Sequence, residues 1–171
     1  MVDNLNEQII YWKLLSHAQW SMYIAATTKG LCYIASQGAQ LEELETWAKK
    51  RLPKYELVED ADVLKPYAME LIEYLEGRRK DFSLPMDLHG TPFQQSVWKA
   101  LQEIPYGQTV SYTDIAQMIH KPTAVRAVGS AIGANPVLIK VPCHRVLAKS
   151  GALAGFRAGL EMKVQLLELE R

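Results

Sequence analysis

A cysteine and a histidine stand side by side in the segment Pro142–Val146. A thiolate is a strong nucleophile, and it forms when a neighbouring base removes the thiol proton. A histidine base commonly needs a carboxylate to fix its tautomer, and Glu170 could supply one. These residue types allow nucleophilic chemistry at Cys143, with His144 as base and Glu170 orienting it. The alternative is a structural cysteine, because a buried cysteine usually serves as a small apolar side chain.

The elements predicted around these residues decide whether they can meet. Residues 137–141 form a short apolar run that predicts a strand, which Pro142 would end. Consecutive side chains of a strand point to opposite faces, so only a turn or a bridging water would let His144 take the thiol proton. Glu170 follows the apolar stripe of the last predicted helix, and at its margin the carboxylate could face the core. The residues expected inward on that helix are Leu160, Val164 and Leu167.

The chain has 171 residues, no net charge and two cysteines, Cys32 and Cys143. Two cysteines make no disulfide framework, and Cys32 has no companions for a zinc site, so we expect free thiols in a reducing cytoplasm. No apolar stretch could span a bilayer, and the first ten residues do not resemble a signal peptide.

Charge is unevenly distributed along the chain. Residues 1–89 carry 10 Lys and Arg against 14 Asp and Glu, whereas residues 90–171 carry 9 against 5. Asp114 is the only acid between Pro105 and Leu160. A locally basic segment is typical of a nucleic-acid interface, although a merely solvated basic face would look the same.

The first half, residues 1–88, predicts a small α/β domain. Two strands around a Lys29–Gly30 turn give a hairpin signal. Helices are expected over residues 41–52 and 64–75, because apolar residues recur there at helical spacing. Residues 82–88 alternate and contain a proline, which indicates an extended connector.

The second half, residues 89–171, predicts a mainly helical domain. A capping-box pattern beginning at Thr91 starts one helix, and another beginning at Ser111 starts a second. After a short break, Thr123 would cap a third helix. Two short helices joined by a brief turn form a helix-turn-helix, whose second helix usually meets DNA. Many proteins contain such helix pairs with no role in DNA binding.

The second helix of that pair has a nearly bare exterior, with Arg126 as its only long polar side chain. Base-reading helices usually carry several amide or guanidinium groups. One arginine on a smooth helix suits close approach to the minor groove, but small residues would also suit tight helix packing. The inward residues would be Val125, Val128 and Ile132, and the bare ones Ala124, Ala127, Gly129, Ser130, Ala131 and Ala134.

Together these features resemble the O6-alkylguanine-DNA alkyltransferases, also named methylated-DNA–protein-cysteine methyltransferases. The resemblance covers residues 91–170, and the first third of the chain is compatible but less diagnostic. It rests on residues 110–112 (VSY), 124–136 (AVRAVGSAIGANP), 141–146 (VPCHRV) and 159–170 (GLEMKVQLLELE). It implies an α/β first domain, ribonuclease-H-like with a small antiparallel sheet, and a mainly α second domain of the winged helix-turn-helix type.

The resemblance implies a role for each matching residue. Cys143 would accept the alkyl group, His144 would draw off the thiol proton through a water, and Glu170 would orient His144. Asn135 would hold the hinge before the cysteine segment. Tyr112 would crowd the target phosphate and donate a proton to guanine N3.

The family's mode of binding also carries over as an expectation. The protein would bind duplex DNA in the minor groove and extrude the damaged base, with Arg126 filling the gap in the base stack. Further DNA-contacting positions would be Tyr112, Ser111, Ala127 and Ser130. The substrate pocket would comprise Val146, Leu153, Phe156, Arg157, Ala158 and Ile132. Phe156 and Arg157 depart from the usual residues of this loop, so the resemblance leaves the preferred alkyl size open.

The implied reaction is a displacement at the alkyl carbon that needs no cofactor or metal. It would consume Cys143 in a single turnover, because a thioether offers water no acyl carbonyl to attack. O4-alkylthymine is a further candidate substrate. The protein is expected to act as a monomer, with double-stranded DNA as its partner and no membrane contact.

Three other functions fit parts of the pattern. A lesion-binding alkyltransferase-like protein would flip the base without reacting, but such relatives carry tryptophan in place of the cysteine. A transcription regulator would carry polar base-reading side chains where Ala127 and Ala131 stand. A Cys-His hydrolase would need an oxyanion hole and would turn over an ester or peptide. Cys143 and the bare helix favour the alkyltransferase.

Overall fold

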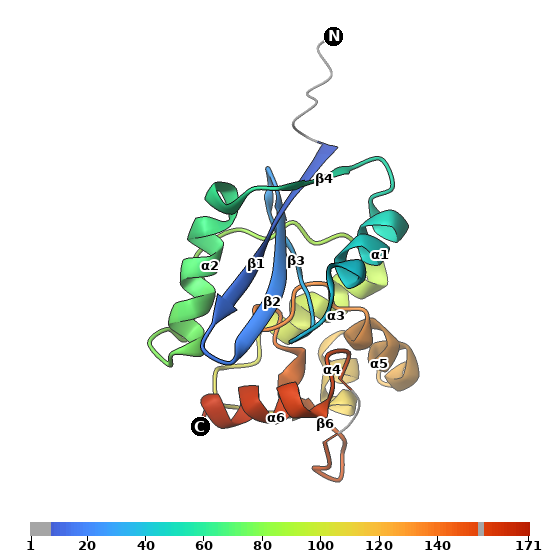
Figure 1. The fold of residues 1–171 in the computed structure, drawn as a ribbon. Coiled ribbons are helices and arrows are strands. Elements are labelled where there is room, and N and C mark those ends of the chain that lie inside the picture. Colours follow the sequence, from blue (N-terminus) through green and yellow to red (C-terminus); the bar gives the residue numbers. More distant parts are fainter. Residues whose placement is uncertain (1–7, 154–155) are drawn as a thin grey trace. The chain divides into compact units, whose positions relative to one another are not determined.

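The computed structural model describes residues 8–153 and 156–171, and the chain divides into two compact units, Met1–His89 and Gly90–Arg171 (Figure 1). Residues 1–7, where no signal peptide was expected, and residues 154–155 of the expected pocket loop lie outside the described residues. In the part of the chain that is described, every helix is too short or too polar to cross a bilayer.

The first unit is built on a four-stranded sheet in the order β3-β2-β1-β4. Its strands are β1 (Ile9–His17), β2 (Trp20–Thr27), β3 (Gly30–Ile34) and β4 (Glu56–Glu59). The hairpin predicted around Lys29–Gly30 is confirmed as β2 and β3. The expectation of a wholly antiparallel sheet is wrong, because β4 pairs in parallel with β1. Neither strand was predicted, since burial along β1 does not alternate and β4 has only four residues.

Both helices predicted for the first unit are confirmed as α1 (Leu41–Arg51) and α2 (Ala61–Leu75), and they lie on either side of the sheet (Figure 1). Leu44 and Ala48 of α1 share a buried cluster with sheet residues such as Ile10. This apolar contact is the main stabilisation that fixes α1 on its face of the sheet.

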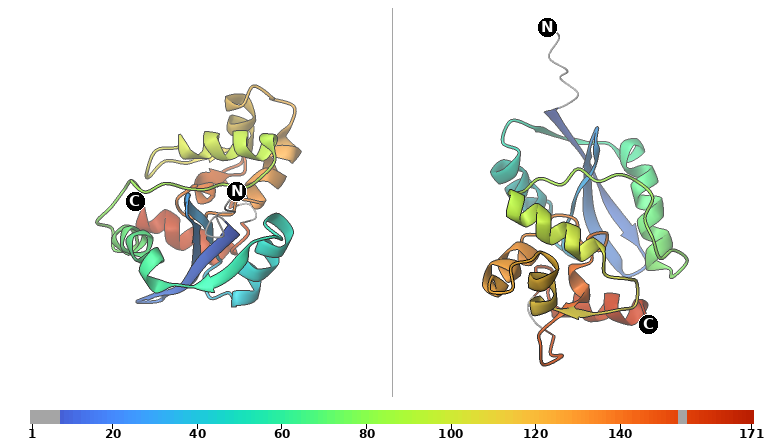
Figure 2. Two further views of the ribbon diagram at one scale, coloured as in Figure 1. Left: turned by 90° about the horizontal axis from the view of Figure 1, so that it is seen from above. Right: turned by 180° about the vertical axis from the view of Figure 1, so that it is seen from behind.

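The second unit begins with α3 (Pro92–Gln102), whose predicted Thr91–Gln94 capping box is present. Helix α4 (Tyr112–Met118) starts at the predicted capping box of Ser111. Helix α5 (Val125–Gly133) follows after a short turn, and α4 and α5 lie next to each other in both views of Figure 2. The helix-turn-helix is confirmed, except that Thr123 is not its cap. Ala124 holds that position and makes no side-chain cap.

The segment from α5 to the end of the chain contains a 3-10 turn η2 (Cys143–Arg145), the short strand β6 (Val146–Leu147) and α6 (Leu160–Leu169). Strand β6 pairs in parallel with β5 (Val110–Ser111), which directly precedes α4. The strand expected over residues 137–141 is wrong. Backbone bonds from Lys140 N to Leu138 O (2.8 Å) and from Val141 N to Val137 O (3.0 Å) close a buried turn instead. An apolar run predicts burial, but it does not tell a strand from a buried turn.

In some helices of the second unit, the residues that are buried differ from those expected from the sequence. On α6 the buried residues are Met162, Lys163 and Leu166, whereas Leu160 is 48 % exposed. The expected stripe was wrong because apolar residues occur on more than one side of this helix. On α5, Ala131 is buried instead of bare.

Candidate active site

Cys143 opens the turn η2 and is only 3 % exposed. Its backbone N–H donates to the carbonyl oxygen of Val141 (2.8 Å), so the chain doubles back directly before the thiol. The alternation of side chains that a strand would impose is therefore absent at Cys143 and His144. A turn at this point was one of the two arrangements, beside a bridging water, that were expected to let His144 take the thiol proton.

Asn135 joins the thiol to the residues that follow α5. The side-chain nitrogen Nδ2 of Asn135 lies 3.2 Å from Sγ of Cys143 and donates to the carbonyl oxygen of Val141 (2.8 Å). The side-chain oxygen Oδ1 accepts from the backbone N–H of Val137 (3.0 Å). A side chain that is 1 % exposed thus closes the buried turn and contacts the thiol.

His144 and Glu170, which lie 26 positions apart in the sequence, meet in the core of the second unit. Nε2 of His144 lies 2.8 Å from Oε2 of Glu170, and both side chains are buried. Nδ1 of His144 is buried and has no hydrogen-bond partner among the described residues. An imidazole that donates from Nε2 to a carboxylate keeps Nδ1 as its basic nitrogen. The geometry therefore leaves His144 able to accept a proton at Nδ1.

Sequence reasoning missed Arg145, which completes this buried cluster. Nε and Nη2 of Arg145 donate to Oε1 (2.8 Å) and Oε2 (2.9 Å) of Glu170. Nη1 donates to the carbonyl oxygen of Ile104 (2.6 Å). The arginine stands directly after the Cys-His pair in the sequence, but spacing alone does not reveal which acid it would meet.

Sequence reasoning also missed Lys163, because a lysine on a helix is normally exposed. Its side chain is fully buried, and Nζ donates to the carbonyl oxygen of Val146 (2.6 Å). Burial lowers the pKa of Lys163, whereas the neighbouring Cys143 raises it. The ammonium of Lys163 and a thiolate at Cys143 therefore stabilise each other.

The charge state of the cysteine and histidine follows from burial. Burial raises the pKa of the Cys143 thiol, although the hydrogen bond from Asn135 and the positive charges of Arg157 and Lys163 lower it in part. Burial lowers the pKa of His144, although Glu170 raises it in part. Both groups are neutral at rest near pH 7, which is the state in which a proton can pass from the thiol to the imidazole.

Tyr112 is the first residue of α4 and is half-buried. A Cβ atom at Gly129 would lie 3.9 Å from the Tyr112 ring, so the ring lies against α5 where that helix has no side chain. Burial, and next the charge of Cys143, raise the pKa of the Tyr112 phenol. The phenol is protonated at neutral pH and is coupled electrostatically to Cys143.

The residues expected to meet DNA are exposed on α5. Arg126, Ala127 and Ser130 all face solvent in the second unit. Ser111 differs, because its hydroxyl accepts from the backbone N–H of Asp114 (3.0 Å) as the cap of α4. Its hydroxyl therefore already has a structural role.

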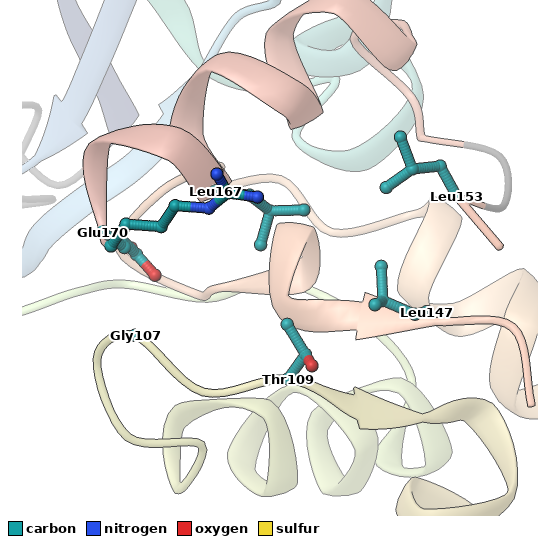
Figure 3. A pocket seen from close by; sticks show the side chains of 7 residues that line it. Gly107, Thr109, Leu147, Leu153, Leu167 and Glu170 are labelled. Atoms are coloured by element: carbon teal, nitrogen blue, oxygen red, sulfur yellow. The ribbon is translucent and has the colours of Figure 1, made fainter. Parts of the chain in front are cut away.

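The residues expected to form the substrate pocket divide into two groups. Val146 and Ile132 are buried, and the positive charge of Arg157 acts on the Cys143 thiol. Phe156 and Ala158 are half-buried. Leu153, by contrast, lines a cavity of about 300 Å³ whose lining does not include Cys143. Figure 3 shows its side chain converging there with those of Leu147 and Leu167.

The described residues contain no group of three or more His, Cys, Asp or Glu side chains that could hold a metal ion. The candidate reactive groups of the second unit are Cys143, His144, Glu170, Asn135 and Tyr112, and Arg145 and Lys163 lie around them.

Comparison with known proteins gives matches over both units. The ribonuclease-like domain of 6-O-methylguanine DNA methyltransferase matches residues 10–88, and the DNA-binding domain of the same family matches residues 92–171. The chain is 59 % identical over 166 residues to the inducible methylated-DNA–protein-cysteine methyltransferase of Bacillus subtilis, covering 97 % of this chain and 93 % of that protein. It is 38 % identical to the methylated-DNA–protein-cysteine methyltransferase of Methanosarcina mazei, over 94 % of this chain and 97 % of that protein.

A solved structure agrees with these matches. The crystal structure of Mycobacterium tuberculosis OGT in complex with DNA superposes with a TM-score of 0.78 at 36 % identity, covering 95 % of this chain and 92 % of that one. The two-unit architecture expected from the sequence, an α/β unit followed by a helical one, is thereby confirmed. The chain belongs to the 6-O-methylguanine DNA methyltransferase family.

Proposed function

We propose that this alkyltransferase repairs DNA by moving the alkyl group of O6-alkylguanine irreversibly onto Sγ of Cys143. Membership of the family makes the chain a DNA alkyltransferase. The single observation that carries the assignment of the acceptor is the 3.2 Å contact of Asn135 with the Cys143 thiol, beside the buried His144–Glu170 pair. No other cysteine among the described residues has such partners, since burial and Asp87 raise the pKa of Cys32 strongly.

The proposed chemistry is a displacement at the alkyl carbon. The thiol proton passes through a water to Nδ1 of His144, the S–C bond forms, and the bond from carbon to O6 of guanine breaks. Guanine leaves badly as an anion, so the Tyr112 phenol donates a proton to N3. The raised pKa of Tyr112 keeps that proton available at neutral pH. The imidazolium and phenolate that remain exchange protons with solvent, and the thioether stays on Cys143.

The substrate in this proposal is a base extruded from duplex DNA, because the damaged atom is unreachable inside the base stack. Arg126 is exposed on α5 beside the small residues Ala127 and Ser130, which supports close approach to the minor groove with one inserted side chain. The Mycobacterium tuberculosis relative in complex with DNA supports DNA as the partner. O4-alkylthymine is a second candidate substrate of the same site.

The protein would act as a monomer and without a cofactor, because thiol, base and proton donor all come from the second unit. A reducing cytoplasm is the compartment that fits this chemistry, since an oxidised Cys143 could not accept an alkyl group. Cys32 and Cys143 are both free thiols.

Mass spectrometry tests the proposal in one step. The protein is mixed with a duplex that carries O6-methylguanine, and the intact protein and its peptides are weighed. We expect one methyl group on the peptide that contains Cys143 and an equal amount of restored guanine. Tight binding without a change of mass would instead identify a lesion-binding protein, and continued turnover beyond one equivalent would identify a different reaction.

A further inference from the structure

Glu170 occupies an unfavourable place for an ionised carboxylate. It caps the carboxyl end of α6, where the partial negative charge of the helix dipole disfavours a second negative charge. It is also only 4 % exposed, so water provides little compensation. His144 is neutral at rest and offers one hydrogen bond at 2.8 Å. The charge compensation comes from Arg145, which binds both carboxylate oxygens.

The loop that follows α3 holds this pair from the other side. Ile104 accepts a hydrogen bond from Nη1 of Arg145 (2.6 Å), and the Tyr106 ring lies 5.7 Å from the guanidinium carbon. The Tyr106 hydroxyl donates to the carbonyl oxygen of Leu169 (3.3 Å), the residue before Glu170.

Gly107 approaches the backbone of Glu170 more closely than any other residue type could. It has φ +79°, and a Cβ atom at this position would lie 2.9 Å from the carbonyl oxygen of Glu170. Figure 3 shows the backbone at Gly107 passing close to the end of the helix that carries Glu170. A side chain here would push Glu170 away from His144.

We propose that Ile104, Tyr106, Gly107 and Arg145 form a clamp that fixes the Glu170 carboxylate against His144, and that Arg145 and Gly107 are positioning residues for alkyl transfer. The contacts described above join these four residues to Leu169 and Glu170, and the clamp acts through Glu170 on the orientation of the histidine base. This inference rests on the proposed function, because it assumes that the His144–Glu170 pair serves transfer to Cys143.

The charges that face His144 give the clamp a measurable signature. Glu170 and Lys163 face it from α6, and Arg145 and Cys143 come from its own turn. Glu170 raises the pKa of His144, whereas Arg145 and Lys163 lower it. Loss of the Arg145 charge therefore raises the pKa of His144. The pH below which His144 can no longer accept the thiol proton rises with it.

The first test compares two glycine substitutions with equal backbone strain. Gly107→Ala meets the Glu170 carbonyl, whereas Gly77→Ala has nearly the same φ (+76°) and nothing within 4 Å. We expect Gly107→Ala to slow methyl transfer from a saturating O6-methylguanine duplex by about tenfold or more, since small displacements of catalytic groups cost up to about a hundredfold. Duplex affinity should be unchanged, and Gly77→Ala should transfer at the wild-type rate. Equal rates in the two variants would overturn the clamp.

The second test separates positioning from folding through the pH profile. In Arg145→Met we expect slower transfer, an acid limb of the pH–rate profile moved to higher pH, and the same upward move of the His144 ring pKa by NMR. Arg145→Lys keeps the positive charge but loses the bidentate hydrogen bond to Glu170. The acid limb of its pH–rate profile should therefore stay near that of the wild type, while its rate of methyl transfer still falls. An unmoved acid limb in Arg145→Met would overturn the assignment of Arg145 as a positioning residue.

Tyr106→Phe tests the clamp if Gly107→Ala does not fold, because it keeps the aromatic ring and loses the hydrogen bond to Leu169. Slower transfer by this variant supports the clamp, and transfer at the wild-type rate overturns it.

The mass of the wild-type protein and the rate of Glu170→Gln together distinguish failure of the clamp from failure of the proposed function. If the wild-type protein gains no methyl group on Cys143, the proposed function falls and the clamp falls with it. If methyl transfer to Cys143 occurs but Glu170→Gln transfers at the wild-type rate, the His144–Glu170 pair does not serve transfer and the clamp falls while transfer to Cys143 stands. If Glu170→Gln is slow while the Gly107 and Arg145 variants are fast, only the clamp is refuted.

Discussion

The side-chain amide nitrogen of Asn135 lies 3.2 Å from Sγ of Cys143, and the same side chain closes the buried turn between α5 and the cysteine. One residue thus sets both the backbone path that leads to the thiol and a hydrogen bond to it. The hydrogen bond stabilises the thiolate, because it lowers the pKa of Cys143 against the effect of burial. Structure and reactivity therefore depend on the same amide.

Asn135→Ala should lower both the stability of the protein and the reactivity of the Cys143 thiol. It leaves the N–H of Val137 buried without its side-chain partner and removes one of the two hydrogen bonds to the carbonyl oxygen of Val141, so we expect a loss of about 1–3 kcal/mol in the free energy of unfolding. The pKa of the Cys143 thiol should rise, which is measured from the pH dependence of its alkylation by iodoacetamide. Ser96→Ala, on the exposed side of α3, is the control for both measurements. An unchanged thiol pKa in folded Asn135→Ala would contradict the role of the amide.

Cys143→Ala should keep binding to duplex DNA and lose all transfer of the methyl group. The thiol is 3 % exposed and makes no bond on which the fold depends besides that with Asn135, so the variant should fold with a loss of about 1–2 kcal/mol. Binding is measured by fluorescence anisotropy of a labelled O6-methylguanine duplex, and transfer by the mass of the protein. Cys32→Ala is the matched control and should transfer normally. Methyl transfer by Cys143→Ala would refute the assignment of the acceptor.

The stability of the protein should fall in weak acid because of His144. Its pKa is lower in the folded protein than in the unfolded chain, where it is near 6.5, so the unfolded state binds the proton first as pH falls. The contribution of His144 to the free energy of unfolding is present above pH 6.5. It is lost as the pH falls below this value, by up to about 1.4 kcal/mol per pH unit. Urea unfolding between pH 5 and 7 should therefore show a steeper loss for the wild type than for His144→Gln. The exposed His120→Asn should keep the wild-type slope, and parallel curves for all three proteins would contradict the prediction.

The sequence predicted the parts of the site that depend on local signals. Capping boxes at Thr91 and Ser111 gave the starts of α3 and α4, because their side chains bond only three residues away. The mixed sheet was missed because the parallel pairing of β1 with β4 joins segments far apart in the chain. Pairing between distant segments leaves no mark in either segment alone.

The burial of the positively charged side chains in the site could not be predicted either, because it also depends on contacts between distant segments. Arg145 and Lys163 are buried because each finds a specific acceptor, Glu170 for one and the Val146 carbonyl for the other. Charged side chains are buried only when paired, and the partner is chosen by the tertiary structure. Glu170 was expected to face the core. Its place on the buried side of α6 follows from Leu166 and Met162, one and two turns earlier, and not from the stripe that was expected.

Arg126→Ala should impair repair of duplex DNA far more than reaction with a free base. If Arg126 fills the gap left by the extruded base, its loss makes extrusion costlier, and we expect transfer from an O6-methylguanine duplex to slow by about tenfold or more. Reaction with free O6-alkylguanine needs no extrusion and should change by less than about twofold. Lys99→Ala, which removes an equal charge from the exposed side of α3, is the control. Equal losses on both substrates would place Arg126 in the reaction itself and not in the base stack.

The salt dependence of duplex binding separates an inserted arginine from one that merely contacts a phosphate. Each neutralised phosphate contributes nearly one unit to the slope of log affinity against log salt. Loss of a phosphate contact would therefore reduce that slope by about one in Arg126→Ala. An inserted side chain acts chiefly by stabilising the open base stack, so we expect weaker binding to the damaged duplex with a nearly unchanged slope. A slope reduced by a full unit, with duplex repair otherwise intact, would assign Arg126 to the DNA backbone.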